Sequence, residues 1–130
     1  MASFDLFASG YAGRFQRAFP RCFINMQNEI IIHPGRNSYF SLTGIKSEIE
    51  LKAKVLEWLS REAIKGGSPS TKKYHLQGIN EVLEADFDAS EMELIYTYLG
   101  NAVNHEKTLL FIESGYDLNI LESKEADNGK

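Results

Sequence analysis

Six acidic residues lie within thirteen positions of this chain, and they form its densest group of chemically reactive side chains: Glu81, Glu84, Asp86, Asp88, Glu91 and Glu93. Such a cluster could dock on a basic groove of another protein, including one that normally holds DNA or RNA, because complementary charge directs and speeds association. Acids at helix N-termini offer a structural alternative, which accounts for Asp88 and Glu91. Acid–base catalysis would need a carboxyl group with a raised pKa in a cleft, and the sequence indicates neither. We therefore predict a protein-binding surface and no catalytic residues.

A second set of charged residues has the opposite sign. Arg14, Arg17 and Arg21 recur at helical spacing, and Arg36 follows in an expected turn. Arginines beside aromatic rings are the minimum for binding nucleic acid without sequence preference. The whole chain has a formal net charge of −4, however, whereas a dedicated nucleic-acid binder is usually basic. Nucleic-acid binding through these arginines, which we call the basic edge, is therefore the alternative hypothesis.

Other chemistry has weaker support in the sequence. The stretch that begins at Asp86 resembles the start of a calcium loop, but Glu91 and Thr97 stand where that loop needs glycine and a bidentate glutamate. Cys22 and the three histidines show no zinc-ligand spacing, and no orienting motif surrounds Cys22 as a nucleophile. We predict a buried thiol at Cys22, no metal site and no cofactor.

Charge is divided unevenly between the two parts of the chain. Residues 1–80 carry 11 Lys or Arg against 6 Asp or Glu, a net charge of +5, and residues 81–130 carry 3 against 12, a net charge of −9. The 130 residues, 43% of them hydrophobic, are enough for one domain with its own core. A single cysteine and the lack of an apolar run of about 20 residues favour a cytoplasmic protein without a membrane span.

The spacing of apolar residues predicts an α+β fold. Aromatic residues at steps of three or four from Phe4 to Phe19 predict an N-terminal helix that ends at Pro20. Three short β-rich segments follow, at 22–26, 29–33 and 38–42, and they predict a small three-stranded antiparallel sheet.

About four packed helices are expected after the sheet. Ser47, Ser68, Asp88 and Asn104 are the candidate caps. We predict a single domain over residues 1–121 and a polar, disordered tail over 122–130. The expected core residues are Phe15, Phe23, Ile30, Ile32, Phe40, Val55, Leu56, Trp58, Leu59, Ile79, Leu83, Ile95, Leu99, Leu110 and Ile112.

Two stretches, within a resemblance that covers most of residues 22–121, together resemble a known group of proteins: NSYFSL at 37–42 running into LKAKVLEWLSREA at 51–63, and ELIYTYLGNAVNHEKTLLFIESGYDLNIL at 93–121. They are similar to small uncharacterised proteins encoded on phages, plasmids and integrative elements of Gram-positive bacteria. The resemblance implies an accessory function of mobile DNA and brings no catalytic residues with it. Our first hypothesis is a non-enzymatic protein that binds another protein through its acidic surface. The specific version of this hypothesis is an inhibitor of a host nucleic-acid-handling defence complex such as CRISPR-Cas.

Overall fold

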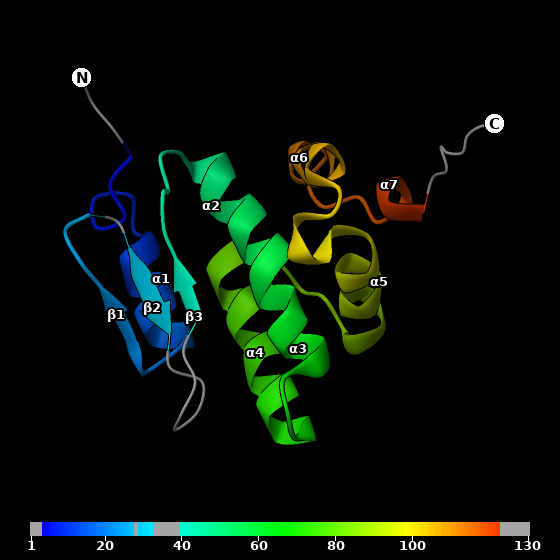
Figure 1. Ribbon diagram of the computed structural model, residues 1–130, viewed down its shortest axis with the longest axis horizontal. Coiled ribbons are helices and arrows are strands. Elements are labelled where there is room, and N and C mark those ends of the chain that lie inside the picture. The colour runs from blue at the N-terminus through cyan, green and yellow to red at the C-terminus, as the bar shows by residue number, and fades with distance from the viewer. Residues whose placement is uncertain (1–3, 28, 33–39, 123–130) are drawn as a thin grey trace.

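The fold has three groups of elements side by side (Figure 1). The computed structural model describes residues 4–27, 29–32 and 40–122. Helix α1 and the sheet lie at one side, the helices α2, α3 and α4 lie in the middle, and α5, α6 and α7 lie at the other side. The elements are α1 (Tyr11–Ala18), β1 (Cys22–Ile24), β2 (Ile30–Ile32), β3 (Phe40–Leu42), α2 (Glu48–Lys54), η1 (Val55–Leu59), α3 (Ser60–Lys65), α4 (Pro69–Leu83), α5 (Ala89–Leu99), η2 (Gly100–Ala102), α6 (His105–Glu113) and α7 (Asn119–Glu122). The predicted α+β class is confirmed.

The sheet is the antiparallel meander that the sequence predicts. Its strand order is β1-β2-β3, and Cys22 pairs with Ile32 in the first ladder. Side chains alternate between the two faces of a strand, so Cys22 is buried while Phe23 is 63% exposed. The expected core position at Phe23 is therefore wrong. The turn expected at 33–37 lies outside the described residues, as does the side chain of Phe40.

The N-terminal helix begins later than predicted. Gly10 has φ of 90°, a left-handed conformation that glycine adopts without steric cost, and α1 starts at the next residue. Leu6, in the turn before Gly10, is fully buried, while Phe7 is half exposed. The aromatic spacing before Gly10 thus belongs to a turn that folds back on the core.

The middle of the molecule contains one continuous helical segment, formed by α2, η1 and α3. Ser47 caps its start by accepting a hydrogen bond from the backbone N–H of Glu50 at 3.2 Å, as predicted. η1 is a π-helix, whose wider turn shifts the side chains that follow it around the axis. Glu57 is consequently buried and Trp58 is 36% exposed, so the expected core position at Trp58 is wrong.

The next two helices begin at the predicted caps. The Ser68 hydroxyl accepts a hydrogen bond from the Thr71 backbone N–H at 3.2 Å, with Pro69 in the first turn of α4. Asp88 and Glu91 form a capping box at the start of α5. These ends are correctly predicted because each depends on residues only three positions apart.

Helix α6 turns a different side to the core than predicted. Leu110 is 57% exposed and Ile112 is partly buried, whereas Phe111 is fully buried. Residues 109–112 are all apolar, so their spacing does not reveal which side faces inward. The expected core position at Leu110 is wrong.

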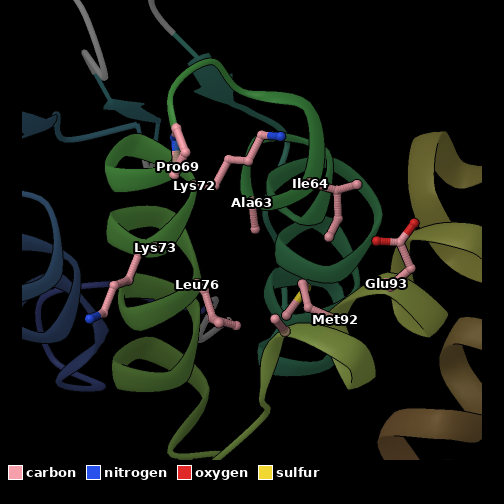
Figure 2. Close-up of a pocket in the computed structure, with 9 residues that line it drawn as sticks. Ala63, Ile64, Pro69, Lys72, Lys73, Leu76, Met92 and Glu93 are labelled. Atoms are coloured by element: carbon pink, nitrogen blue, oxygen red, sulfur yellow. The ribbon is translucent and has the colours of Figure 1, made fainter.

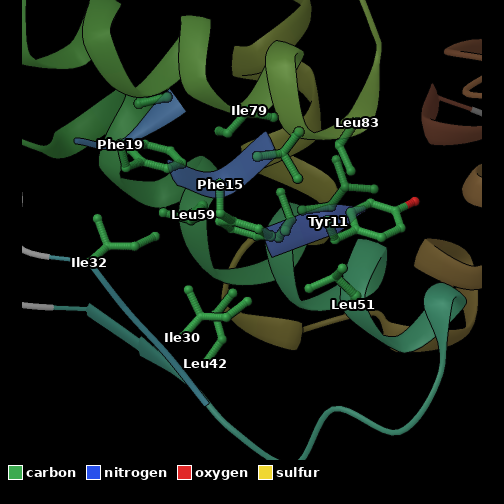
Figure 3. Close-up of a cluster of buried hydrophobic side chains, with 14 of the residues drawn as sticks. Tyr11, Phe15, Phe19, Ile30, Ile32, Leu42, Leu51, Leu59, Ile79 and Leu83 are labelled. Carbon is green, nitrogen blue, oxygen red and sulfur yellow. The ribbon is translucent and has the colours of Figure 1, made fainter. Parts of the chain in front are cut away.

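The main core lies between α1, the sheet and the middle helices (Figure 3). Phe15 of α1 and Phe19, which follows the end of that helix, extend between Ile30 and Ile32 of the sheet and Ile79 of α4. The other buried positions that the sequence predicts are Val55, Leu56, Leu59, Leu83, Ile95 and Leu99. This packing fixes α1 against α4, which determines how the charged residues of both helices meet.

Candidate functional site

The two charged sets predicted from the sequence meet where α1 packs against α4. Arg14 Nη2 lies 3.3 Å from Glu84 Oε2, and Arg17 Nε lies 3.1 Å from Glu81 Oε2. Arg14 also donates a hydrogen bond to the Val82 carbonyl at 3.2 Å. The acidic cluster and the basic edge are therefore not two separate surfaces, because two members of each set form ion pairs with one another.

The basic edge loses much of its free charge through this pairing. The Arg14 side chain is only 24% exposed, and its guanidinium carbon lies 4.5 Å from the centroid of the Tyr11 ring. Arg17 and Arg21 are exposed, while Arg36 lies outside the described residues. A phosphate backbone would have to compete with Glu81 and Glu84 for the same guanidinium groups.

The other four predicted acidic residues lie beyond this contact. Asp88 Oδ1 accepts a hydrogen bond from the Glu91 backbone N–H at 2.8 Å, and Glu91 Oε1 accepts one from the Asp88 backbone N–H at 2.9 Å. The bond from the Glu91 backbone and the bond from the Ser90 hydroxyl lower the pKa of Asp88. Asp86 and Glu93 are exposed, and they take no part in the capping box.

These four belong to a wider group of acidic residues, which we call the acidic surface. Residues 85–122 contain one lysine and eight acidic residues, a net charge of −7: Asp86, Asp88, Glu91, Glu93, Glu106, Glu113, Asp117 and Glu122. All but Glu91 are exposed. Among the residues that the structure describes, none of the eight forms an ion pair. Lys107 instead donates a hydrogen bond to the Leu121 carbonyl at 3.1 Å and lies over the ring of Tyr98.

A groove adjoins the acidic surface between α3, α4 and α5 (Figure 2). It has a volume of about 480 Å³ and is lined by Ala63, Ile64, Pro69, Lys72, Lys73, Leu76, Ala89, Met92 and Glu93. Leu76 and Met92 lie near one another at one end, and the Glu93 carboxylate points toward the groove from the opposite wall. This volume is in the range of natural ligand pockets.

A buried carboxylate that sequence reasoning missed lies on η1. Glu57 is 3% exposed, and its Oε2 lies 2.6 Å from Nδ1 of His105 in the first turn of α6. Asn101 and Ala102, just before α6, both have positive φ. No sequence signal identifies the pair, because 48 positions separate its members and a π-helix such as η1 is rare.

The single cysteine, Cys22, is buried in β1. Burial raises the pKa of the Cys22 thiol to about 11, which keeps it protonated and poorly nucleophilic near neutral pH. Within residues 4–27, 29–32 and 40–122, no three His, Cys, Asp or Glu side chains gather in a way that could hold a metal ion. No helix in that same part of the chain has the length and hydrophobicity required to cross a membrane.

Comparison of the chain with protein-family models, with curated proteins and with solved structures finds no match.

Proposed function

We propose that this chain is a non-enzymatic protein that binds a basic surface of another protein through its acidic surface. The observation that carries the proposal is the net charge of −7 over residues 85–122, where none of the acidic residues forms an ion pair within the described part of the chain. Free carboxylates raise the rate of encounter with a cationic partner and make that rate depend on salt.

The pairing at the α1–α4 contact refines which acidic residues take part. Glu81 and Glu84 already neutralise Arg17 and Arg14, so they contribute little to an external partner. Asp86 and Glu93 remain from the set predicted to bind protein, together with acidic residues of α6 and α7. Asp88 and Glu91 add charge but also hold the start of α5.

The resemblance to proteins of mobile genetic elements implies where the chain acts and on what. The chain acts in the cytoplasm as an accessory protein of a mobile genetic element. Its partner is a host protein that handles nucleic acid, such as a component of a CRISPR-Cas defence complex. The acidic surface occupies the basic groove that otherwise holds DNA or RNA, and so inhibits the complex.

The test is affinity capture at low salt from a nuclease-treated lysate of a Gram-positive host, followed by binding kinetics with the purified captured protein. We expect a basic protein whose association rate with the D86N/E113Q variant is several-fold lower than with the wild type, because each removed carboxylate weakens electrostatic steering. Addition of the chain should also displace nucleic acid from that partner.

The matched control is R17Q/E81Q, which removes both members of one exposed ion pair and leaves the net charge unchanged. It should associate nearly as fast as the wild type. An equal loss of association rate in the two variants would contradict the proposal, and so would the capture of no basic protein. A mobility shift of bare nucleic acid that disappears in R17Q would favour the alternative hypothesis instead.

A further inference from the structure

We infer that the groove between α3, α4 and α5 binds an amphipathic helix of the partner protein, with an acidic side chain of that helix against Lys72 and a basic one against Glu93. This inference rests on the proposed function, since it names the element of the partner that docks beside the acidic surface.

The apolar part of the groove suits side chains of a helix. Ala63 and Ile64 come from α3, Leu76 comes from α4, and Met92 comes from α5, so three helices surround the space. Ile64 and Leu76 are only partly buried and present apolar surface to an occupant. Met92 is fully buried and Ala63 nearly so, and the apolar surface that an occupant can reach therefore comes from Ile64 and Leu76.

The charged part of the groove specifies the flanks of the occupant. In Figure 2, the Lys72 side chain reaches across the end of the groove near Ile64, while Glu93 faces it from α5. The nitrogen of Lys73 points away from the groove. Within the described part of the chain, neither Lys72 nor Glu93 forms an ion pair. An occupant with one acidic and one basic flank would pair with both.

The length of the groove agrees with a helical occupant. Pro69 and Leu76 both line it and are seven positions apart on α4, a distance of about 10 Å or two helical turns. A helix presents apolar side chains at i, i+4 and i+7 over that length, which is the usual spacing of helix-in-groove recognition.

The test uses three labelled helical peptides of about four turns that share one leucine stripe and differ only in their flanks. One peptide has a glutamate flank and a lysine flank, one has glutamate on both flanks, and one has lysine on both flanks. Fluorescence anisotropy at low salt gives the affinity of each. We expect the mixed peptide to bind the wild-type protein at least about tenfold more tightly than either of the others.

Charge exchange in the groove should change this preference. K72E makes both walls acidic and should favour the all-lysine peptide, and E93K makes both walls basic and should favour the all-glutamate peptide. A helix can lie in the groove in either direction, so a mixed peptide with its two flanks exchanged would bind as well as the original one. The ranking of peptides that differ in the charge of their flanks does not depend on this direction. K46E, at an exposed lysine outside both the groove and the acidic surface, should leave the wild-type ranking unchanged.

Three results would overturn the inference: no peptide binding, the same ranking for all variants, or complete displacement of the mixed peptide by dodecanoate, which would indicate a site for an apolar anion.

I64K supplies a second check, since it fills the groove with charge and should abolish binding in a protein that circular dichroism confirms as folded. If the peptide ranking fails while D86N/E113Q still slows partner association, the groove inference is wrong and the proposed function stands. If instead the peptide ranking holds while D86N/E113Q associates as fast as the wild type, the groove binds a helix and the proposed role of the acidic surface is wrong.

Discussion

Tyr11 shows how one side chain serves both the core and the surface. Its ring is buried, and its hydroxyl donates a hydrogen bond to Glu48 Oε2 at 2.6 Å. This bond lowers the pKa of Glu48 below its ordinary value of 4.5, with a further contribution from Lys52. Burial, followed by the bond to Glu48, raises the pKa of Tyr11 well above its usual range. The contact is therefore strongest when Glu48 is ionised and Tyr11 is neutral.

We expect Y11F to destabilise the protein by about 1 kcal/mol near neutral pH, because the ring is kept and one hydrogen bond is lost. A lowered folded-state pKa contributes stability that is present above the unfolded pKa and is lost as pH falls through the folded value. The difference between wild type and variant should thus shrink below pH 4.5. Urea unfolding measured from neutral to acidic pH gives this difference. Y98F is the control, and a pH-independent difference would contradict the prediction.

At the scale of elements, the contact between α1 and α4 depends on a glycine inside a helix. A Cβ placed on Gly78 would lie 2.4 Å from the ring of Phe19, so the close approach of the two helices needs the absence of a side chain there. Gly13, in α1, has a different environment, since a Cβ there would meet only Arg17 Nη1 at 3.5 Å. The same substitution should therefore have opposite effects at these two positions.

We expect G78A to destabilise the protein by roughly 1–3 kcal/mol, because the methyl group overpacks a core that cannot expand freely. G13A should stabilise it by up to about 1 kcal/mol, because alanine favours a helix over glycine. Thermal and urea unfolding of the two variants measure both effects. Stabilisation by G78A would show that Phe19 moves aside without cost.

Prediction of the elements succeeded where neighbouring residues determine them. Ser47, Ser68 and the Asp88–Glu91 pair marked helix starts because each cap acts over three positions. The π-helix at η1 was not predicted, and there Glu57 is buried while Trp58, an expected core residue, is 36% exposed. Because π-helices are rare, the apolar spacing of this segment predicts an ordinary α-helix.

At the scale of the whole molecule, the contact between Glu57 and His105 joins the middle helices to α6. The Glu57 side chain is nearly inaccessible to water, and the His105 Nδ1–H can donate to it whether the imidazole is neutral or charged. The pair therefore fixes the position of one helix of the acidic surface against the rest of the fold.

We expect H105A to lower the free energy of unfolding by about 1–3 kcal/mol, because it leaves a buried carboxylate without its partner. The double variant E57L/H105A should recover most of this loss, since an apolar side chain needs no partner in that position. Urea unfolding of the single and double variants forms the measurement. Equal stability of H105A and wild type would indicate that water replaces the imidazole at no cost.

Composition and residues close together in the chain were enough to predict the α+β class, the antiparallel sheet, the helix starts at Ser47, Ser68 and Asp88, and the uneven division of charge. The interactions of the charged side chains, by contrast, follow from the packing of the helices. The tertiary structure packs α1 against α4 and pairs Arg14 with Glu84 and Arg17 with Glu81, across more than sixty positions. It also places Glu93, which forms no ion pair with any residue that the structure describes, in the lining of a groove made by three helices. Such pairing depends on distances in space between residues far apart in sequence, and no local pattern contains those distances.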